Sequence, residues 1–179
     1  MGASPLITPA LINTILDQYE LNVLGKHGLA HWGRVLENGL RLAETTGARP
    51  DVVTYFAMFH DACRLNDRRD IGHGHRGAQL AASLHGEFFD LDDAGFALLY
   101  DACVAHTDGG TEGDITIVTC WDADRLDLPR AGITPQPSRL CTEPARDPDT
   151  IQWARERSLS DFTPAYVHDQ WLRGRTDST

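Results

Sequence analysis

The sequence has no long uninterrupted hydrophobic run. The 179 residues are 41% hydrophobic, but charged residues interrupt every stretch before it reaches the ~18 apolar residues needed to cross a bilayer. The first residues, MGASPLITPALINTI, lack the basic start and the long apolar core of a signal peptide. Leu6 stands where an N-myristoylation motif has Ser or Thr. We therefore predict a cytoplasmic protein without membrane contact.

Lysine is almost absent. Lys26 is the only one, so nearly all the positive charge is arginine, and 26 acidic against 16 basic residues give a net charge of −10. A field of this sign opposes binding to a nucleic-acid backbone, so long nucleic acids are not expected as partners. A small anionic ligand remains compatible, because arginine forms paired hydrogen bonds to phosphate wherever it lines a site.

The few cysteines are widely spaced, so none belongs to the close pairs typical of zinc sites. Cys63, Cys103 and Cys120 fall in apolar helical patterns, where we expect reduced, buried side chains that act as small hydrophobic residues. Repeats, low-complexity tracts and long linkers are also missing. A chain of this length and composition is expected to form one domain, residues 1–179.

Apolar residues recur at helical spacing along most of the chain. Helices are predicted at about 8–19, 29–46, 50–61, 76–88, 92–105, 115–126, 151–158 and 164–172. The β-branched start of the 115–126 segment, ITIVT, also fits a strand. Polar connections are predicted at 64–74 and 107–114, and an irregular segment at the proline-rich 132–148. The predicted fold class is all-α, a single-domain helical bundle.

Histidine and aspartate residues occur in an ordered set along these segments: His31, the His60-Asp61 doublet, His73, His106 and Asp124. Imidazole nitrogen and carboxylate oxygen together suit divalent metals. Asp61 lies in a predicted helix that is otherwise apolar, where burying an unpaired carboxylate costs several kcal/mol and a metal ion removes that cost. Taken singly, His31 could instead be a core histidine whose ring nitrogens are hydrogen-bonded within the protein. His106 could be a residue at the C-terminal end of a helix, where the helix dipole favours a positive charge.

This order of residues resembles that of the HD-domain metal-dependent phosphohydrolases, over about residues 29–130. The adjacent His60-Asp61 doublet and the late Ala-Asp-Arg tripeptide that contains Asp124 carry the resemblance. The resemblance implies a helical bundle with a metal site at its centre. It implies four ligands for one ion, His31, His60, Asp61 and Asp124, and six for a two-ion site, with His73 and His106 added and Asp61 as the bridge. The segment from Gly132 to Arg146 resembles one found in a small bacterial branch of HD proteins, and this implies no particular substrate.

Two of these ligand positions have close competitors in the sequence. His73 lies four residues before a Gly-Ala pair, as in related HD sequences, and is preferred to His75, which would then contact the substrate or support a ligand. Asp124 falls on the Ala-Asp-Arg position, whereas Asp122 lies on another helical face. Asp127, three residues later, can hydrogen-bond a ligand or pair with a nearby arginine.

The resemblance implies hydrolysis of a phosphate ester of a small nucleotide or related metabolite. One or two divalent ions (Mn, Mg, Co, Fe, Ni or Zn) would convert a bound water to hydroxide near neutral pH and offset the phosphoryl charge. Asp61 and Arg64 are the expected catalytic residues. Arg64, Arg76, Arg139 and His75 are the expected contacts of a small phosphorylated substrate.

Several alternatives stay open at the level of sequence. The arginines near 64–76 would otherwise pair with Asp67 or Asp70 in a solvated loop, and residues 132–148 form either a lid or pocket wall, or a loop that packs against the back of the domain. A di-iron HD-fold oxygenase would use the same ligands for oxygen chemistry. A non-catalytic, metal-stabilised binding module is the third functional class. The oligomeric state is not predicted.

Overall fold

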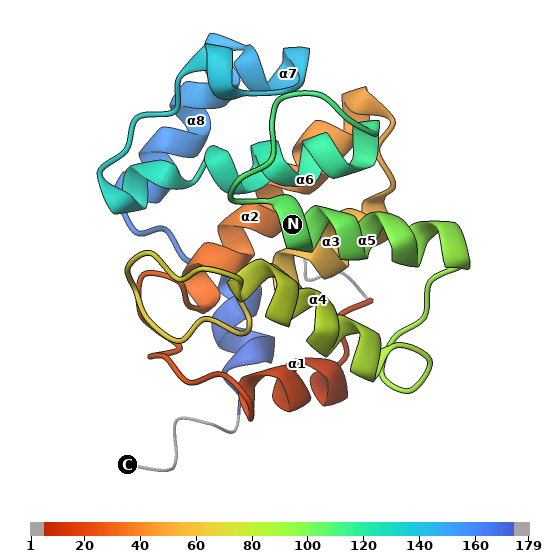
Figure 1. Cartoon of the computed structure of the whole chain (residues 1–179). Helices are drawn as coiled ribbons and strands as arrows, with labels where there is room; N and C mark the ends of the chain where they lie inside the picture. Colours follow the sequence, from red (N-terminus) through yellow and green to blue (C-terminus); the bar gives the residue numbers. More distant parts are fainter. Residues whose placement is uncertain (1–5, 174–179) are drawn as a thin grey trace.

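The structure, a computed structural model, describes residues 6–173, and within this range it is helical without β-strands (Figure 1). This confirms the predicted all-α class. The helices are α1 (Pro9–Leu16), α2 (Leu29–Thr46), α3 (Pro50–Phe59), α4 (His73–Leu84), α5 (Asp93–Ala105), α6 (Ile115–Arg125), α7 (Glu143–Arg146) and α8 (Pro148–Leu159), with the short turns η1 (Leu128–Ala131), η2 (Pro137–Arg139) and η3 (Val167–Trp171). None of them is both long and apolar enough to cross a membrane.

Helix α3 lies at the centre of the molecule and packs against α2, α4, α5 and α6 (Figure 1). All its residues from Val52 to Phe59 are buried. Each large apolar side chain buried in this way contributes about 1.5–3 kcal/mol. The surrounding helices are therefore held around one main core, and the ends of α3 are fixed in position.

Two glycines of α4 allow its backbone to touch the neighbouring helices. A Cβ atom on Gly74 would lie 2.2 Å from the carbonyl oxygen of Cys103 in α5, and one on Gly77 would lie 2.1 Å from that of Phe59 in α3. Any side chain would force these helices apart. The close approach fixes the start of α4 beside the end of α5.

Side-chain caps explain where several helices begin. The Asp92 carboxylate accepts a hydrogen bond from the Gly95 amide (2.6 Å) at the start of α5. Asp114 accepts one from the Thr116 amide (2.8 Å) at the start of α6. Such caps satisfy amides that have no partner within the helix. The Asp114 cap explains why ITIVT forms a helix although its residues also favour strands.

The predicted helix boundaries differ from the observed ones in several places, and among them α4 ends at Leu84 and α8 begins at Pro148. Helix α1 ends at Leu16, and α3 ends at Phe59, so the His-Asp doublet follows α3 rather than lying within it. Helix α4 begins at His73, before the predicted start, directly after Gly72 in the left-handed conformation (φ 82°). The 132–148 segment is partly helical, since it contains η2 and α7, the latter capped by Thr142.

Candidate metal centre

The ends of five helices meet at one place in the molecule. The residues that they bring there are His31 in the first turn of α2, His60 and Asp61 directly after α3, His73 at the first position of α4, His106 directly after α5, and Asp124 in the last turn of α6. All of them are buried except Asp124, whose side chain is 14% exposed. The six residues that the sequence singled out therefore lie together.

The six side chains form two groups, each with the spacing of ligands around one ion. In the first group, His31 Nε2 lies 3.0 Å from His60 Nε2 and 3.5 Å from Asp124 Oδ1. In the second, His73 Nε2 lies 2.9 Å from His106 Nε2, and Asp61 Oδ1 lies 3.2 Å from His73 Nε2. Two ligands ~2.1 Å from one ion and at a right angle are about 3.0 Å apart. Both groups can therefore hold a metal ion.

Backbone carbonyls set the tautomers of three of these histidines. The Nδ1 atoms of His60, His73 and His106 lie 3.1, 2.6 and 2.7 Å from the carbonyl oxygens of residues 56, 70 and 103. A carbonyl oxygen only accepts, so each Nδ1 carries the hydrogen, and in the neutral ring each Nε2 keeps a bare lone pair. Paired Nε2 lone pairs at about 3 Å repel one another unless a cation lies between them.

The fourth histidine is oriented by a buried carboxylate. Asp127 Oδ2 accepts a hydrogen bond from His31 Nδ1 (2.7 Å), and Asp127 also pairs with Arg34, whose Nε donates to Oδ1 at 2.7 Å. Burial alone would raise the pKa of Asp127, but the contacts with His31 and the nearby arginines lower it to about 2. Asp127 therefore stays ionised and holds His31 with its Nε2 directed at the site, as the sequence analysis allowed.

Asp61 connects the two groups. Its Oδ2 lies 3.5 Å from His31 Nε2, while its Oδ1 faces the second group. Two donors hold the carboxylate in place: His27 Nδ1 at 2.9 Å from Oδ2, and Arg64 Nε at 2.9 Å from Oδ1. One carboxylate with an oxygen directed at each group suits a bridge between two ions.

The electrostatics of the site favour an added positive charge. Burial lowers the pKa of His60 to about 3, so this imidazole stays neutral. Burial also disfavours the charged form of His106, but the nearby Asp61 and Asp124 outweigh it and raise its pKa. Asp124 Oδ1 is buried and has no hydrogen-bond partner among the described residues. A divalent ion would supply the missing partner and the charge.

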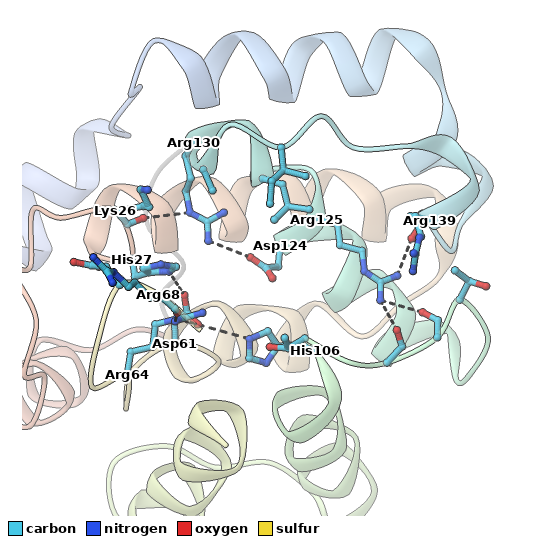
Figure 2. Close-up of a pocket in the computed structure, with 18 of the residues that line it drawn as sticks. Lys26, His27, Asp61, Arg64, Arg68, His106, Asp124, Arg125, Arg130 and Arg139 are labelled. Atoms are coloured by element: carbon cyan, nitrogen blue, oxygen red, sulfur yellow. Dashed lines mark hydrogen bonds and ion pairs between the residues drawn. The ribbon is translucent and has the colours of Figure 1, made fainter. Parts of the chain in front are cut away.

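The centre opens into a pocket of about 870 Å³. Six basic side chains line it, Lys26, Arg64, Arg68, Arg125, Arg130 and Arg139, against three acidic ones, Asp61, Asp67 and Asp124. Figure 2 shows Lys26 and Arg130 on one side of Asp124, and Arg139 on the other. The 132–148 segment contributes part of the wall. The pocket is thus cationic within a chain of net charge −10.

Only some of the predicted substrate contacts lie at the pocket. Arg64 and Arg139 line the pocket. Arg76 does not: its Nη2 donates to both oxygens of Asp70 (2.7 and 2.8 Å), which is the loop pairing that the sequence analysis left open. His75 is exposed and lies edge-on to Tyr100, 6.2 Å between ring centroids. Neither Arg76 nor His75 lines the pocket, so these two positions depart from the expectation.

The two competing aspartates have distinct roles in the structure. Asp124 belongs to the first group of the metal centre. Asp122 is fully buried and faces the 132–148 segment, where it accepts hydrogen bonds from the Cys141 amide (2.7 Å) and from the Thr142 amide and hydroxyl (both 2.8 Å). Asp122 therefore fastens the pocket wall to α6.

Some residues of the site were missed at the level of sequence. His27 lies just before α2, outside the predicted helices, and its ring lies edge-on to that of His31, 6.2 Å between centroids. Its position four residues before His31 was the available signal for it. Arg130 donates from Nη1 to the carbonyl of Asp127 (2.9 Å), and its Nη2 lies 3.7 Å from Asp124 Oδ1. Only the tertiary fold brings Arg130 and Lys26 to the pocket, so no local pattern predicts them.

Comparisons of the chain with protein-family models, with curated proteins and with solved structures found no match.

Proposed function

We propose that the protein is a metal-dependent phosphohydrolase acting on the phosphate ester of a small nucleotide or related metabolite. The observation that carries the proposal is the pair of adjoining histidine and aspartate groups, joined through Asp61, at a pocket rich in basic side chains. Two-ion sites with cationic surroundings suit phosphoryl transfer. The resemblance of the residue order to the HD-domain phosphohydrolases supports the same reading.

The described residues fit the roles that such a reaction needs. Divalent ions, when bound, would supply Lewis-acid activation of water and neutralise phosphoryl charge. Asp61 would span both ions, held in position by His27 and Arg64. In the reaction, the water oxygen bonds to phosphorus, the ester P–O bond breaks, and a proton of the water passes to the departing alkoxide. Arg64 Nη2 makes no hydrogen bond within the described residues and is directed to the pocket, where it can donate to a phosphoryl oxygen.

Metal content tests the site through two histidines of one helix. We expect the wild-type protein, loaded anaerobically with Mn or Fe, to bind up to two ions per chain. His73→Ala should lose at least one of them, because it removes a Nε2 ligand from the second group. His75→Ala is the matched control, since this side chain lies two residues away and is exposed. Elemental analysis of the three proteins gives the answer, and full metal content in His73→Ala would contradict the assignment.

Activity is tested with a panel of nucleotides, sugar phosphates and cyclic dinucleotides assayed with Mn, Mg, Co and Fe. Release of inorganic phosphate or a phosphomonoester, lost on treatment with a chelator and in Asp61→Ala, is the expected result. If no compound of the panel is hydrolysed and the iron form consumes oxygen, the di-iron oxygenase would replace the proposal. Metal binding without either activity would replace it with a binding module.

A further inference from the structure

The basic side chains of the pocket fall into an inner layer, a wall and an outer layer, and Arg139 lies apart from them on the other side of Asp124. Arg64 and Arg130 form an inner layer, because each lies against a carboxylate of the metal centre: Arg64 Nε donates to Asp61 Oδ1, and Arg130 Nη2 lies 3.7 Å from Asp124 Oδ1. Arg125 belongs to the wall, since its Nη atoms donate to the carbonyls of residues 109, 110 and 139. Most of the side-chain donors of Arg64, Arg125 and Arg130 therefore contact acceptors within the protein.

Lys26 and Arg68 form an outer layer, and their charged groups have no partner among residues 6–173. Both are exposed, both line the pocket, and neither side chain makes a hydrogen bond or ion pair within residues 6–173. Backbone contacts tie this layer to the inner one. Arg130 Nε donates to the carbonyl of Lys26 (3.2 Å), and Arg64 Nη1 donates to the carbonyl of Arg68 (3.1 Å).

The outer layer lies on one side of the metal centre. Figure 2 shows Lys26, His27 and Arg68 gathered on the side of Asp61, away from Arg139. Asp67 lines the same pocket and offsets part of the charge. Arg139 is likewise exposed and without a side-chain partner in residues 6–173, but it lies alone on the other side of Asp124. The two cations Lys26 and Arg68, beside the proposed site of phosphate hydrolysis, suit a second anionic group.

The uncharged residues that line the pocket are consistent with a ligand that is recognised mainly through its negative charge. No Phe, Tyr or Trp occurs among the residues that line the pocket, and its apolar part consists of the aliphatic side chains Leu128, Ala131 and Ile133. The aromatic rings in this lining are the imidazoles of His27 and His106, which are buried against Asp61 and so do not offer a free face for stacking of a base. Affinity must therefore come mainly from the anionic groups of the ligand.

We propose that the substrate carries two phosphate groups, one hydrolysed at the metal centre and a second bound by Lys26 and Arg68. This inference rests on the proposed function and narrows its substrate class to small bisphosphorylated metabolites, among them nucleoside bisphosphates. The second phosphate is not hydrolysed. It holds the substrate in one orientation, so that only one of its two ester phosphates reaches the ions.

Matched substrates and variants test the subsite. The substrate pairs are a sugar monophosphate with its bisphosphate, and a nucleoside 5′-monophosphate with the 3′,5′-bisphosphate. We expect the bisphosphates to have the lower KM. Lys26→Gln and Arg68→Gln should each raise that KM about tenfold, the effect of one lost charge-assisted bond, and leave the KM of the monophosphates within about twofold. Arg69→Gln is the control, because Arg69 is exposed and does not line the pocket.

Equal effects on both members of a pair, or no effect on either, would overturn the subsite while leaving the phosphohydrolase intact. If no phosphate ester is hydrolysed, the proposed function fails, and the subsite is judged by binding alone. In that case, calorimetric titration of the metal-loaded protein with a nucleoside 3′,5′-bisphosphate should still give weaker binding in Lys26→Gln and Arg68→Gln than in Arg69→Gln. Identical binding by all the variants would overturn the subsite as well.

Discussion

At the scale of single residues, the candidate centre depends on which imidazole nitrogen carries the hydrogen. Three of its histidines donate from Nδ1 to backbone carbonyls, and two of those carbonyls belong to the last turns of α3 and α5. Each of these contacts ties the ring to a helix end and leaves Nε2 exposed to the site. His31 depends on the side chain of Asp127 instead, which makes it the ligand that a single substitution disturbs most directly.

Asp127→Asn should weaken metal binding at the first group without removing a ligand. The amide has no charge to keep the His31 Nδ1–H in place and no longer pairs with Arg34, so we expect metal affinity to fall about 10- to 100-fold. Metal titration of the anaerobic protein measures it. Asp161→Asn serves as the comparison, because Asp161 also contacts Arg34 (3.2 Å) but its side chain is 82% exposed and distant from His31 in the network. Equal affinities in the two variants would refute the role of Asp127.

At the scale of elements, α6 connects the metal centre to the pocket wall. Asp124 and Asp122 lie two residues apart on this helix and face in different directions, one into the centre and the other toward residues 141 and 142. The position of the wall is therefore tied to the same helix that carries a ligand.

Substitution of these two aspartates should separate their roles. Asp124→Asn should lose metal and activity, while the unfolding free energy of the metal-free protein stays nearly unchanged. Asp122→Asn should lower the unfolding free energy by about 1–3 kcal/mol, because three hydrogen bonds lose their charged acceptor, and should retain metal. Chemical denaturation and elemental analysis of both proteins measure this. The reverse pattern would show that the assignment of the two aspartates is wrong.

The packing of α4 gives a second prediction for an element. Gly74→Ala should push α4 away from α5, because the new Cβ would meet the Cys103 carbonyl, and His73 would separate from His106. We expect the bound metal to fall from two ions toward one, with the first group retained. Gln79→Ala, on the exposed face of the same helix, should keep both ions. Loss of both ions in a folded Gly74→Ala protein would contradict the expectation that the first group keeps its ion when His73 is displaced.

The helices themselves were largely predictable from the sequence, because apolar spacing and capping residues act locally. The boundary of α4 was not, since it depends on Gly72 adopting a left-handed conformation and on Arg76 binding Asp70 across the preceding loop. The same limit applies to the site. The ordered histidines and aspartates could be read from the chain, whereas the positions of Lys26 and Arg130 depend on tertiary packing.

At the scale of the whole molecule, the candidate centre joins segments far apart in the sequence. Residues 31 and 124, in α2 and α6, meet there with residues near the ends of α3, α4 and α5. An ion bound by these segments in the native state, and not in the unfolded chain, stabilises the fold by mass action. Metal binding and global stability are therefore expected to change together.

Removal of metal should lower the thermal midpoint of the protein. At a free metal concentration of about 100 Kd, each site adds about 2.7 kcal/mol, which corresponds to about 5–10 °C in a chain of this size. Scanning calorimetry with and without a chelator measures the difference. Asp61→Ala should unfold at the same temperature in both conditions, and a full metal-dependent shift in that variant would argue against the bridge.

The solitary lysine has a practical consequence for chemical labelling. Lys26 is the only lysine side chain in the chain and lies exposed on the pocket lining. An amine-reactive fluorophore therefore modifies one side chain besides the α-amino group, and that side chain lies beside the proposed phosphate subsite. A ligand bound there should slow the labelling of Lys26, so that ligands can be found by protection from the dye before any reaction product has been identified.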